Sequence, residues 1–301
     1  MSGSVEVVGL GLITTDYLYR IPRLPAFGSS VRASSYRRAC GGPAATAMAC
    51  LARLGIATRF VGKTGTDHEG EFVAGELARH GVDISRLRRA TGASRVATVL
   101  VDEDTGERGF MSWPESFAPL SVTELDAHDV TDAQVLLVDD GDDVGLQAAR
   151  WARDAGIPVV FDGTWQSEHL HDFLPLVDHA IVGEFFASRW LPDADNETIL
   201  QQLTDLGART AVLTLGAGGC MARSADGRID CPAFPIDVVD TTGAGDAFHG
   251  GYIAALLDGA EIAERLRFAS STAALNCRGL GGQTRLPTRA EVDALCGDQK
   301  A

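Results

Sequence analysis

The sequence has 301 residues, 45% of them hydrophobic and 22% charged, which is the composition of a globular protein and not of a disordered one. Its 41 acidic and 26 basic residues give a formal net charge of −15. A surface this acidic repels phosphate backbones, so we expect no nucleic-acid partner. No uninterrupted apolar run approaches the ~18 residues of a membrane-spanning helix, so we expect no membrane partner either.

The six cysteines, at positions 40, 50, 220, 231, 277 and 296, include no Cys-x-x-Cys pair, and no histidine is spaced to complete a zinc site with them. Most of them stand in apolar or glycine-rich surroundings, as small buried thiols do. The stretch 5–10 contains an acid and no basic leader, which indicates a strand and not a signal peptide. These features predict reduced thiols and a cytoplasmic protein.

Short β-branched runs alternate with helical stretches along the chain. Buried parallel strands are predicted at 59–61, 134–138, 157–161 and 210–214, and apolar spacing of three and four predicts helices over 44–54, 69–80, 146–155 and 197–206. Each of these helices is followed by a glycine directly before or close to the next strand, where a left-handed C-cap belongs. The alternation predicts one α/β domain over 1–301, with a doubly wound, mostly parallel sheet flanked by helices.

Two segments, 17–38 and 94–113, break this alternation. Thr105-Gly106 predicts a hairpin turn between strands at 96–102 and 107–111, and we expect antiparallel strands outside the main sheet in both segments. A small sheet built from both would be a lid inserted into the domain. The alternative is two surface hairpins without a functional role. An exposed lid sheet often provides an interface, so a homodimer through the lid is a further expectation.

The strongest chemical signal is the segment 237–251, in which Gly243, Ala244 and Gly245 precede an apolar helical pattern. A glycine turn that leads into a helix directs several backbone N–H groups and the positive end of the helix dipole at one point, which predicts an anion site. Asp246 falls in the first helical turn, where a carboxylate can accept a hydroxyl proton while the amides stabilise a phosphoryl group in transfer. The alternative is a capping aspartate after an ordinary glycine turn. The P-loop motif Gly-x-x-x-x-Gly-Lys-Ser/Thr is absent from the sequence.

A second glycine cluster, Gly41-Gly42-Pro43, opens the predicted helix at 44–54. The adjacent glycines permit a close approach of backbone to a ligand, and Pro43 suits a first helical turn. Thr46 is one of the few polar groups on this helix, and it faces either a ligand or the carbonyl four residues earlier.

With the motif Asp-Thr-Thr-Gly-Ala-Gly-Asp at 240–246 and the segment 41–55, the sequence resembles the phosphofructokinase-B (PfkB)/ribokinase family of ATP-dependent carbohydrate kinases. Val8-Gly9-Leu10 followed by Asp16, and the stretch 61–67, also fit, so the resemblance covers nearly the whole chain. It implies a ribokinase-like fold with a small β-sheet lid. It also implies transfer of the ATP γ-phosphoryl group to a primary hydroxyl of a sugar, with Asp246 as the base and residues 243–245 as the anion hole.

The resemblance implies further roles. Asp16, Gly41, Gly42 and Thr46 would contact the sugar, Asn276 would border adenine, and the nucleotide loop would be formed by Thr214, Gly216, Gly218 and Gly219. Mg²⁺ would be held mainly by phosphates and water, and Asp240 and Thr242 fall where many relatives place a monovalent cation such as K⁺. Two positions depart from the family. Thr46 replaces a common asparagine, and only Glu184 remains of an Asn-x-x-Glu motif that would reach Mg²⁺ through water.

The motifs look most like the sulfofructose kinase branch, which His249 and Thr46 also fit. The cations with which that branch grips a sulfonate are missing at 28–30 and 111–113, and four acids occupy 139–143. We therefore predict a neutral substrate, a ketose or a furanose, with Arg32 or Arg95 as the remaining lid cations.

A nucleoside kinase is the alternative within the fold, with Phe110, Trp113 or Trp165 as a stacking partner. A catalytically silent sugar- or nucleotide-binding protein is the alternative of another class, and an oxidoreductase is disfavoured by the incomplete glycine fingerprints.

Overall fold

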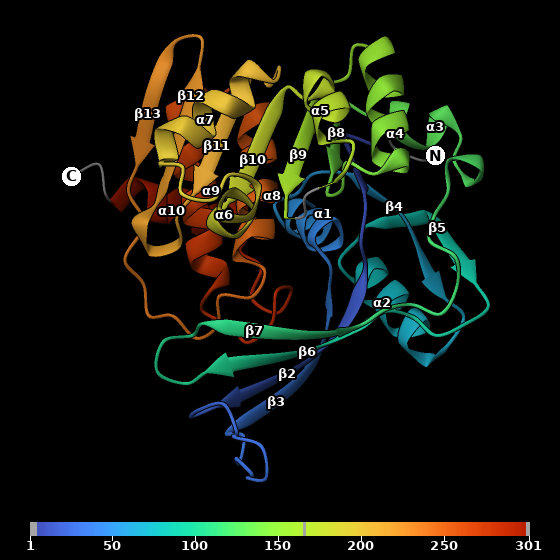
Figure 1. Cartoon of the computed structure of the whole chain (residues 1–301), viewed down its shortest axis with the longest axis vertical. Coiled ribbons are helices and arrows are strands. Elements are labelled where there is room, and N and C mark those ends of the chain that lie inside the picture. The colour runs from blue at the N-terminus through green and yellow to red at the C-terminus, as the bar shows by residue number, and fades with distance from the viewer. Residues whose placement is uncertain (1–4, 165–166, 299–301) are drawn as a thin grey trace.

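The main sheet of the computed structural model, which describes residues 5–164 and 167–298, has nine strands in the order β13-β12-β11-β10-β9-β8-β1-β4-β5 (Figure 1). All neighbouring pairs are parallel except β11–β12 and β12–β13. The strands are β1 (Val7–Leu10), β4 (Thr58–Gly65), β5 (Asp83–Ala90), β8 (Val135–Val138), β9 (Val159–Gly163), β10 (His179–Gly183), β11 (Thr210–Thr214), β12 (Cys220–Ser224) and β13 (Gly227–Cys231).

Helices cover both faces of this sheet. Alternate strand residues enter two separate cores, so that Leu137 packs on one face while Leu136 and Val138 pack on the other. The first face is covered by α1 (Pro43–Arg53), α2 (His68–Arg79), α8 (Ala244–Leu257), α9 (Ile262–Asn276) and α10 (Arg289–Asp298). The second is covered by α3 (Ala127–Thr131), α4 (Asp143–Asp154), α5 (Leu170–Phe173), α6 (Glu184–Trp190) and α7 (Asn196–Asp205).

The two segments outside the alternation meet in one small sheet, which we call the lid. Its order is β3-β2-β6-β7, from β2 (Thr14–Ile21), β3 (Ser35–Gly41), β6 (Val96–Asp102) and β7 (Arg108–Trp113). Figure 1 shows these strands together on one side of the molecule. Within each hairpin the strands are antiparallel, as expected, but β2 and β6 pair in parallel. The reason is that β2 follows β1 and β6 follows β5, and both leave the same edge of a parallel sheet.

The four predicted helices are α1, α2, α4 and α7, and their bounds differ by one residue at most ends. The exception is the start of α4 at Asp143, three residues before the prediction, because the Asp142 side chain accepts hydrogen bonds from Val144 N and Gly145 N and caps the helix. β5 was not predicted, because its sequence Asp-Ile-Ser-Arg-Leu-Arg-Arg-Ala is that of a half-exposed edge strand with no buried run. No helix in the described part of the chain is long and apolar enough to cross a membrane.

Candidate active site

The predicted site residues gather beyond the carboxyl ends of the parallel strands. β1 pairs with β4 on one side and β8 on the other, so the winding of the sheet reverses between β1 and β8. Ligands of open α/β sheets bind at such a reversal, beyond the carboxyl ends of the strands. Asp139 lies directly after β8, and Asp16 of the lid lies near enough to Asp246 of α8 for their charges to interact. The lid and the main sheet therefore face one another across the candidate site.

The turn ahead of α8 is shaped as an anion site requires. Gly243 is the N-cap, with φ 75° and ψ 5°, and a β-carbon there would stand 2.5 Å from Cα of Gly282. The amide of Ala244 donates to Thr241 O at 3.2 Å. Within the described residues, nothing accepts a hydrogen bond from the amides of Gly243, Gly245 or Asp246. These free donors lie at the positive end of the helix dipole.

Asp240 fixes the loop that leads into this turn. Its Oδ1 accepts hydrogen bonds from Thr242 N at 2.8 Å and Thr242 Oγ1 at 2.7 Å, and its Oδ2 accepts one from Gly281 N at 2.7 Å. Asn276 is fully buried, and its Nδ2 contacts Thr242 O at 3.5 Å. The side chains of Asp240 and Asn276 thus fix the loop ahead of α8 through hydrogen bonds. The predicted contacts of Asp240 with a cation and of Asn276 with adenine stay predictions.

Asp246 stands in the first turn of α8 among other acids. Burial raises the pKa of Asp246 well above its ordinary value, and the carboxylates of Asp162, Asp139 and Asp16 raise it further. The Arg108 guanidinium of the lid acts in the opposite direction. A base whose pKa is raised is a stronger proton acceptor once it is ionised. The site therefore has a carboxylate suited to deprotonating a hydroxyl beside free amides suited to an anion.

His249 ties this turn to the main sheet. Its Nδ1 lies 2.7 Å from the carbonyl oxygen of Gly245 and 3.3 Å from Oδ2 of Asp162 at the end of β9. Its Nε2 lies 3.3 Å from the carbonyl oxygen of Ile181 in β10. The ring is buried, so it holds the first turn of α8 in place against two strands. Asp162 was not among the predicted site residues, because a single aspartate after a strand carries no pattern of its own.

At the lid side of the site, Asp16 is 5% exposed and accepts a hydrogen bond from the Thr14 hydroxyl at 2.5 Å. Burial raises the pKa of Asp16 to about 7. A β-carbon on Gly41 would lie 2.0 Å from Oδ2 of Asp16, so only glycine leaves room for this carboxylate. Gly42 has φ 99°, and a β-carbon there would lie 2.3 Å from Leu12 O. Both glycines of the cluster are thus required by close approaches.

Thr46 is buried, and its hydroxyl accepts a hydrogen bond from Gln283 Nε2 at 3.1 Å. The partner is therefore a side chain from the far end of the sequence, and not the carbonyl of the preceding turn. Gln283 is also buried, and its Oε1 has no hydrogen-bond partner among the described residues. Gln283 was missed from sequence, where the only signal was the pair of glycines directly before it.

The acids after β8 are largely engaged with backbone. Oδ2 of Asp139 accepts hydrogen bonds from Leu12 N at 2.8 Å and Ala44 N at 3.0 Å, and burial raises the pKa of Asp139 to about 7. Asp142 caps α4, and Asp143 is exposed and pairs with His169. Of the four acids, Asp139 and Asp142 thus accept hydrogen bonds from backbone amides, and Asp143 is paired with a partly exposed histidine. The Arg95 side chain, predicted to face the substrate, pairs with Glu115 at 2.7 Å.

The predicted nucleotide loop follows β11 at the same edge. Leu215 N donates to Gly219 O at 2.8 Å and Gly218 N to Leu215 O at 2.8 Å, which closes a compact turn over Gly216–Gly218. Gly216 and Gly219 have positive φ, 52° and 87°. The Thr214 hydroxyl contacts Val182 O at 3.4 Å, so the loop also touches β10.

Glu184 begins α6 directly after β10, and its side chain is exposed at the carboxyl edge of the sheet. No group of three or more His, Cys, Asp or Glu residues in the described part of the chain is arranged to hold a metal ion. One exposed carboxylate at this edge of the sheet is the kind of donor that suits Mg²⁺ carried mainly on phosphates and water.

The lid touches the loop ahead of α8. Gly106, in the β6–β7 turn, accepts hydrogen bonds on its carbonyl from Thr241 N at 3.0 Å and Thr241 Oγ1 at 2.9 Å. Arg108 Nη1 donates to Thr241 Oγ1 at 3.2 Å. Arg108 was missed from sequence, because only its place on β7 brings it to Asp246. The lid is thus hydrogen-bonded to the loop ahead of α8, which disfavours the alternative of two surface hairpins without a role.

Of the aromatic residues considered as stacking partners, Phe110 pairs in register with Val99 and shares the face of the lid that carries Asp16. Phe110 is 54% exposed. Trp113 lies on the opposite face by strand alternation. Trp165 lies outside the described residues.

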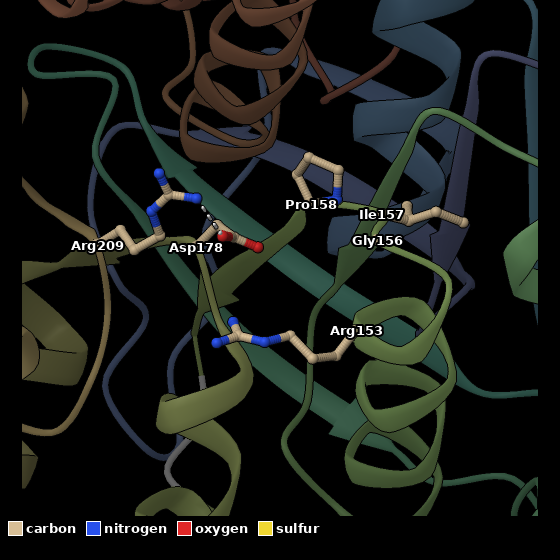
Figure 2. A pocket seen from close by; sticks show the side chains of 6 residues that line it. All are labelled: Arg153, Gly156, Ile157, Pro158, Asp178 and Arg209. Atoms are coloured by element: carbon tan, nitrogen blue, oxygen red, sulfur yellow. Dashed lines mark hydrogen bonds and ion pairs between the residues drawn. The ribbon is translucent and has the colours of Figure 1, made fainter.

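A cavity of about 460 Å³ lies away from this site, at the amino ends of β9, β10 and β11. Figure 2 shows its lining, in which Arg209 forms an ion pair with Asp178 at 3.3 Å and Arg153 reaches in from the end of α4. Because it borders the other edge of the sheet, it contributes nothing to the candidate active site.

Comparison with known proteins identifies the family of this chain. Residues 4–289 match the model of the pfkB family carbohydrate kinases, so the chain belongs to that family and is a carbohydrate kinase. Among its relatives, the ATP-dependent ribose-1-phosphate kinase of Halopiger xanaduensis is 28% identical, covering 98% of this chain and 99% of its own. The probable fructokinase-4 of Arabidopsis thaliana is 29% identical over 96% of both chains.

Solved structures give the same result for the fold. A ribokinase of Arabidopsis thaliana complexed with ribose and ATP superposes with a TM-score of 0.84 at 27% identity, covering 98% of this chain and 99% of that one. A putative ribokinase from Agrobacterium tumefaciens gives 0.89 at 25% identity, with 99% of each chain covered. The predicted ribokinase-like fold and family are confirmed. The assignment to the sulfofructose kinase branch is not supported by these relatives.

Proposed function

We propose that this enzyme transfers the γ-phosphoryl group of ATP to a primary hydroxyl of a monosaccharide, with Asp246 as the general base. The observation that carries the proposal is the placement of Asp246 beside the free amides of Gly243 and Gly245 at the start of α8. Relatives named for ribose-1-phosphate, fructose and ribose, one of them in complex with ribose and ATP, support ATP as donor and a sugar as acceptor.

Asp246 would take the hydroxyl proton as the oxygen attacks phosphorus. The amides of Gly243, Gly245 and Asp246 would receive the charge that develops on the phosphoryl oxygens, and Arg108 could add a positive charge from the lid. When bound, Mg²⁺ on the nucleotide neutralises part of the phosphate charge, and Glu184 would reach it through water. Asp240 and Thr242 are the candidates for a K⁺ site.

The sugar would lie between Asp16 and the turn at Gly41 and Gly42. The Asp16 carboxylate can accept two hydroxyl hydrogens, and the unpartnered Oε1 of Gln283 can accept another beside Thr46. A lid bonded to the catalytic loop would keep water from the phosphoryl group.

We propose a neutral ketose or furanose as the substrate, because Arg95 is engaged with Glu115 and acids surround the site. The second candidate is a nucleoside, which the half-exposed Phe110 on the inner face of the lid favours. An anionic sugar would instead have to use Arg108.

A coupled assay of ADP release over ribose, fructose, adenosine, ribose 1-phosphate and sulfofructose tests the proposal. We expect the highest kcat/KM with a neutral sugar. Turnover of adenosine alone would favour the nucleoside kinase, and turnover of only the anionic sugars would contradict the proposed substrate class. ATP binding without turnover of any sugar or nucleoside would point to a silent binding protein.

We further propose a cytoplasmic homodimer. No disulfide bond joins the cysteines within the described residues, which suits a reducing compartment that also supplies ATP. The outer face of the lid exposes Tyr36 at 54%, Met111 at 60% and Trp113 at 68%. An exposed apolar face of this kind is shielded from water when the lid of a second copy of this chain covers it.

A further inference from the structure

Two cysteines stand opposite one another at the edge of the main sheet. Cys220, the first residue of β12, pairs in antiparallel register with Cys231, the last residue of β13. Their Sγ atoms lie 3.6 Å and 3.9 Å from the same Ser270 hydroxyl on α9, so both thiols are on one face of the hairpin. Directly opposed residues of an antiparallel pair have Cα atoms about 4.5–5.5 Å apart, inside the range that a disulfide spans.

We propose that Cys220 and Cys231 are a reversible dithiol–disulfide pair, oxidised by a peroxide, whose disulfide form alters the adjoining nucleotide loop. The proposed mechanism assigns no role to either residue. From sequence they are eleven positions apart and lack the Cys-x-x-Cys spacing, so only the hairpin register brings them together.

The two thiols are chemically unequal. Cys231 is partly exposed, and the hydrogen bond from the Cys220 thiol lowers the pKa of Cys231 to about 7, with Arg267 acting in the same direction. Cys220 is 2% exposed, and its hydrogen bond with Cys231 together with burial raises its pKa. Cys231 is therefore the accessible thiolate and Cys220 the resolving thiol.

The oxidation balances in two steps. The Cys231 thiolate attacks one peroxide oxygen, the O–O bond breaks, and the leaving hydroxide takes a proton to become water, leaving a sulfenic acid. The Cys220 sulfur then attacks the Cys231 sulfur, the S–S bond forms and the S–O bond breaks, and the Cys220 proton leaves with the hydroxyl as a second water. The dithiol loses two electrons and the peroxide gains them.

Both cysteines adjoin the backbone that closes the nucleotide loop. Cys220 follows Gly219, whose carbonyl accepts the hydrogen bond from Leu215 N. A β-carbon on Gly219 would lie 2.2 Å from the carbonyl oxygen of Cys231, so the end of β13 packs directly against Gly219. A disulfide draws the two β-carbons to about 3.8 Å, closer than the ladder spacing, and so moves the backbone next to Gly219. This consequence rests on the proposed function of the loop, whereas disulfide formation does not.

The test uses the full-length enzyme, reduced with dithiothreitol, desalted and titrated with hydrogen peroxide. Trypsin places the two cysteines on separate peptides, 210–223 and 229–265, so a non-reducing peptide map detects their crosslink. We expect this crosslink to form before any other cysteine is oxidised and to be reversed by dithiothreitol. In the oxidised form the Kd for ATP should rise about threefold or more, and a threefold rise corresponds to a loss of under about 1 kcal/mol of binding free energy.

Cys231→Ser and Cys220→Ser should each abolish the crosslink and the change in ATP affinity. Cys296→Ser, at the other partly exposed cysteine, should keep both. No 220–231 crosslink in the wild type would overturn the proposal, and a crosslink with unchanged ATP affinity would overturn the coupling to the loop. If the crosslink forms reversibly but neither redox form binds ATP, the proposed function fails and the dithiol pair stands.

Discussion

Buried carboxyl groups at this site couple folding to pH. Asp16 and Asp139 each have a pKa raised by burial to about 7, against an ordinary value of 3.8. Between these pH values the unfolded chain releases protons that the folded chain keeps. The stability that protonation gives is therefore fully present below about pH 4 and lost as the pH rises to about 7.

Asp139→Asn should remove the part of this loss of stability at high pH that comes from Asp139. The asparagine side chain keeps an oxygen that can accept the hydrogen bonds from Leu12 N and Ala44 N. We expect the variant to be more stable than the wild type by about 1–3 kcal/mol at pH 8, since one pKa unit is worth about 1.4 kcal/mol. The difference should shrink toward pH 5. Urea unfolding at both pH values measures it, and a variant less stable at pH 8 would contradict the assigned pKa.

Gly41 is the residue on which the position of Asp16 depends. Gly41→Ala brings a β-carbon to 2.0 Å from Oδ2 of Asp16 and should displace this carboxylate. We expect kcat/KM for the sugar to fall by about tenfold to a hundredfold with ATP affinity unchanged. Gly75→Ala in α2, where a β-carbon meets nothing within 4 Å, is the matched control and should leave both constants unchanged. Equal effects of the two substitutions would remove the assigned role of Asp16.

Among the elements, the β6–β7 turn links the lid to the loop ahead of α8. Gly106 has φ 71°, and a β-carbon there would lie 2.6 Å from Cγ1 of Val238. Gly106→Ala combines a left-handed strain of about 1–2 kcal/mol with this clash. The turn should therefore move away from Thr241.

We expect Gly106→Ala to lower kcat/KM for the sugar several-fold and to raise ATP hydrolysis in the absence of sugar, because a displaced lid admits water. Both rates can be followed by ADP release. Gly109→Ala, on β7 in open space, is the control. A lid without a role in excluding water would show no change in hydrolysis for either variant.

Prediction from sequence succeeded where periodicity and capping agreed. The helices α1, α2 and α7 and the turn at Gly106 follow from apolar spacing and turn glycines, and the Gly243 turn follows from its motif. The contacts that were missed join residues far apart in the sequence. Arg108 reaches Asp246 through strand register, Gln283 reaches Thr46 across the whole chain, and the parallel pairing of β2 with β6 depends on where both strands leave the main sheet.

At the scale of the whole molecule, an acidic chain of net charge −15 carries an exposed apolar face on its lid. If a second lid covers that face, light scattering should give a mass of twice the 31.8 kDa of one chain. Trp113→Glu should then shift the mass toward the monomer, because a carboxylate would be buried without a partner. The exposed Val238, at 40%, serves as the control position in Val238→Glu. A monomeric wild type at micromolar concentration would contradict the dimer.

In the proposed reaction a carboxylate at the start of α8 removes a proton while adjacent amides hold the phosphoryl group. Asp246→Asn keeps the shape of the site and removes the base. Steady-state turnover with the best sugar, measured beside ATP binding by calorimetry, tests it most directly. We expect kcat to fall by several hundredfold or more, with the Kd for ATP within about threefold of the wild type. Wild-type turnover in Asp246→Asn would contradict it.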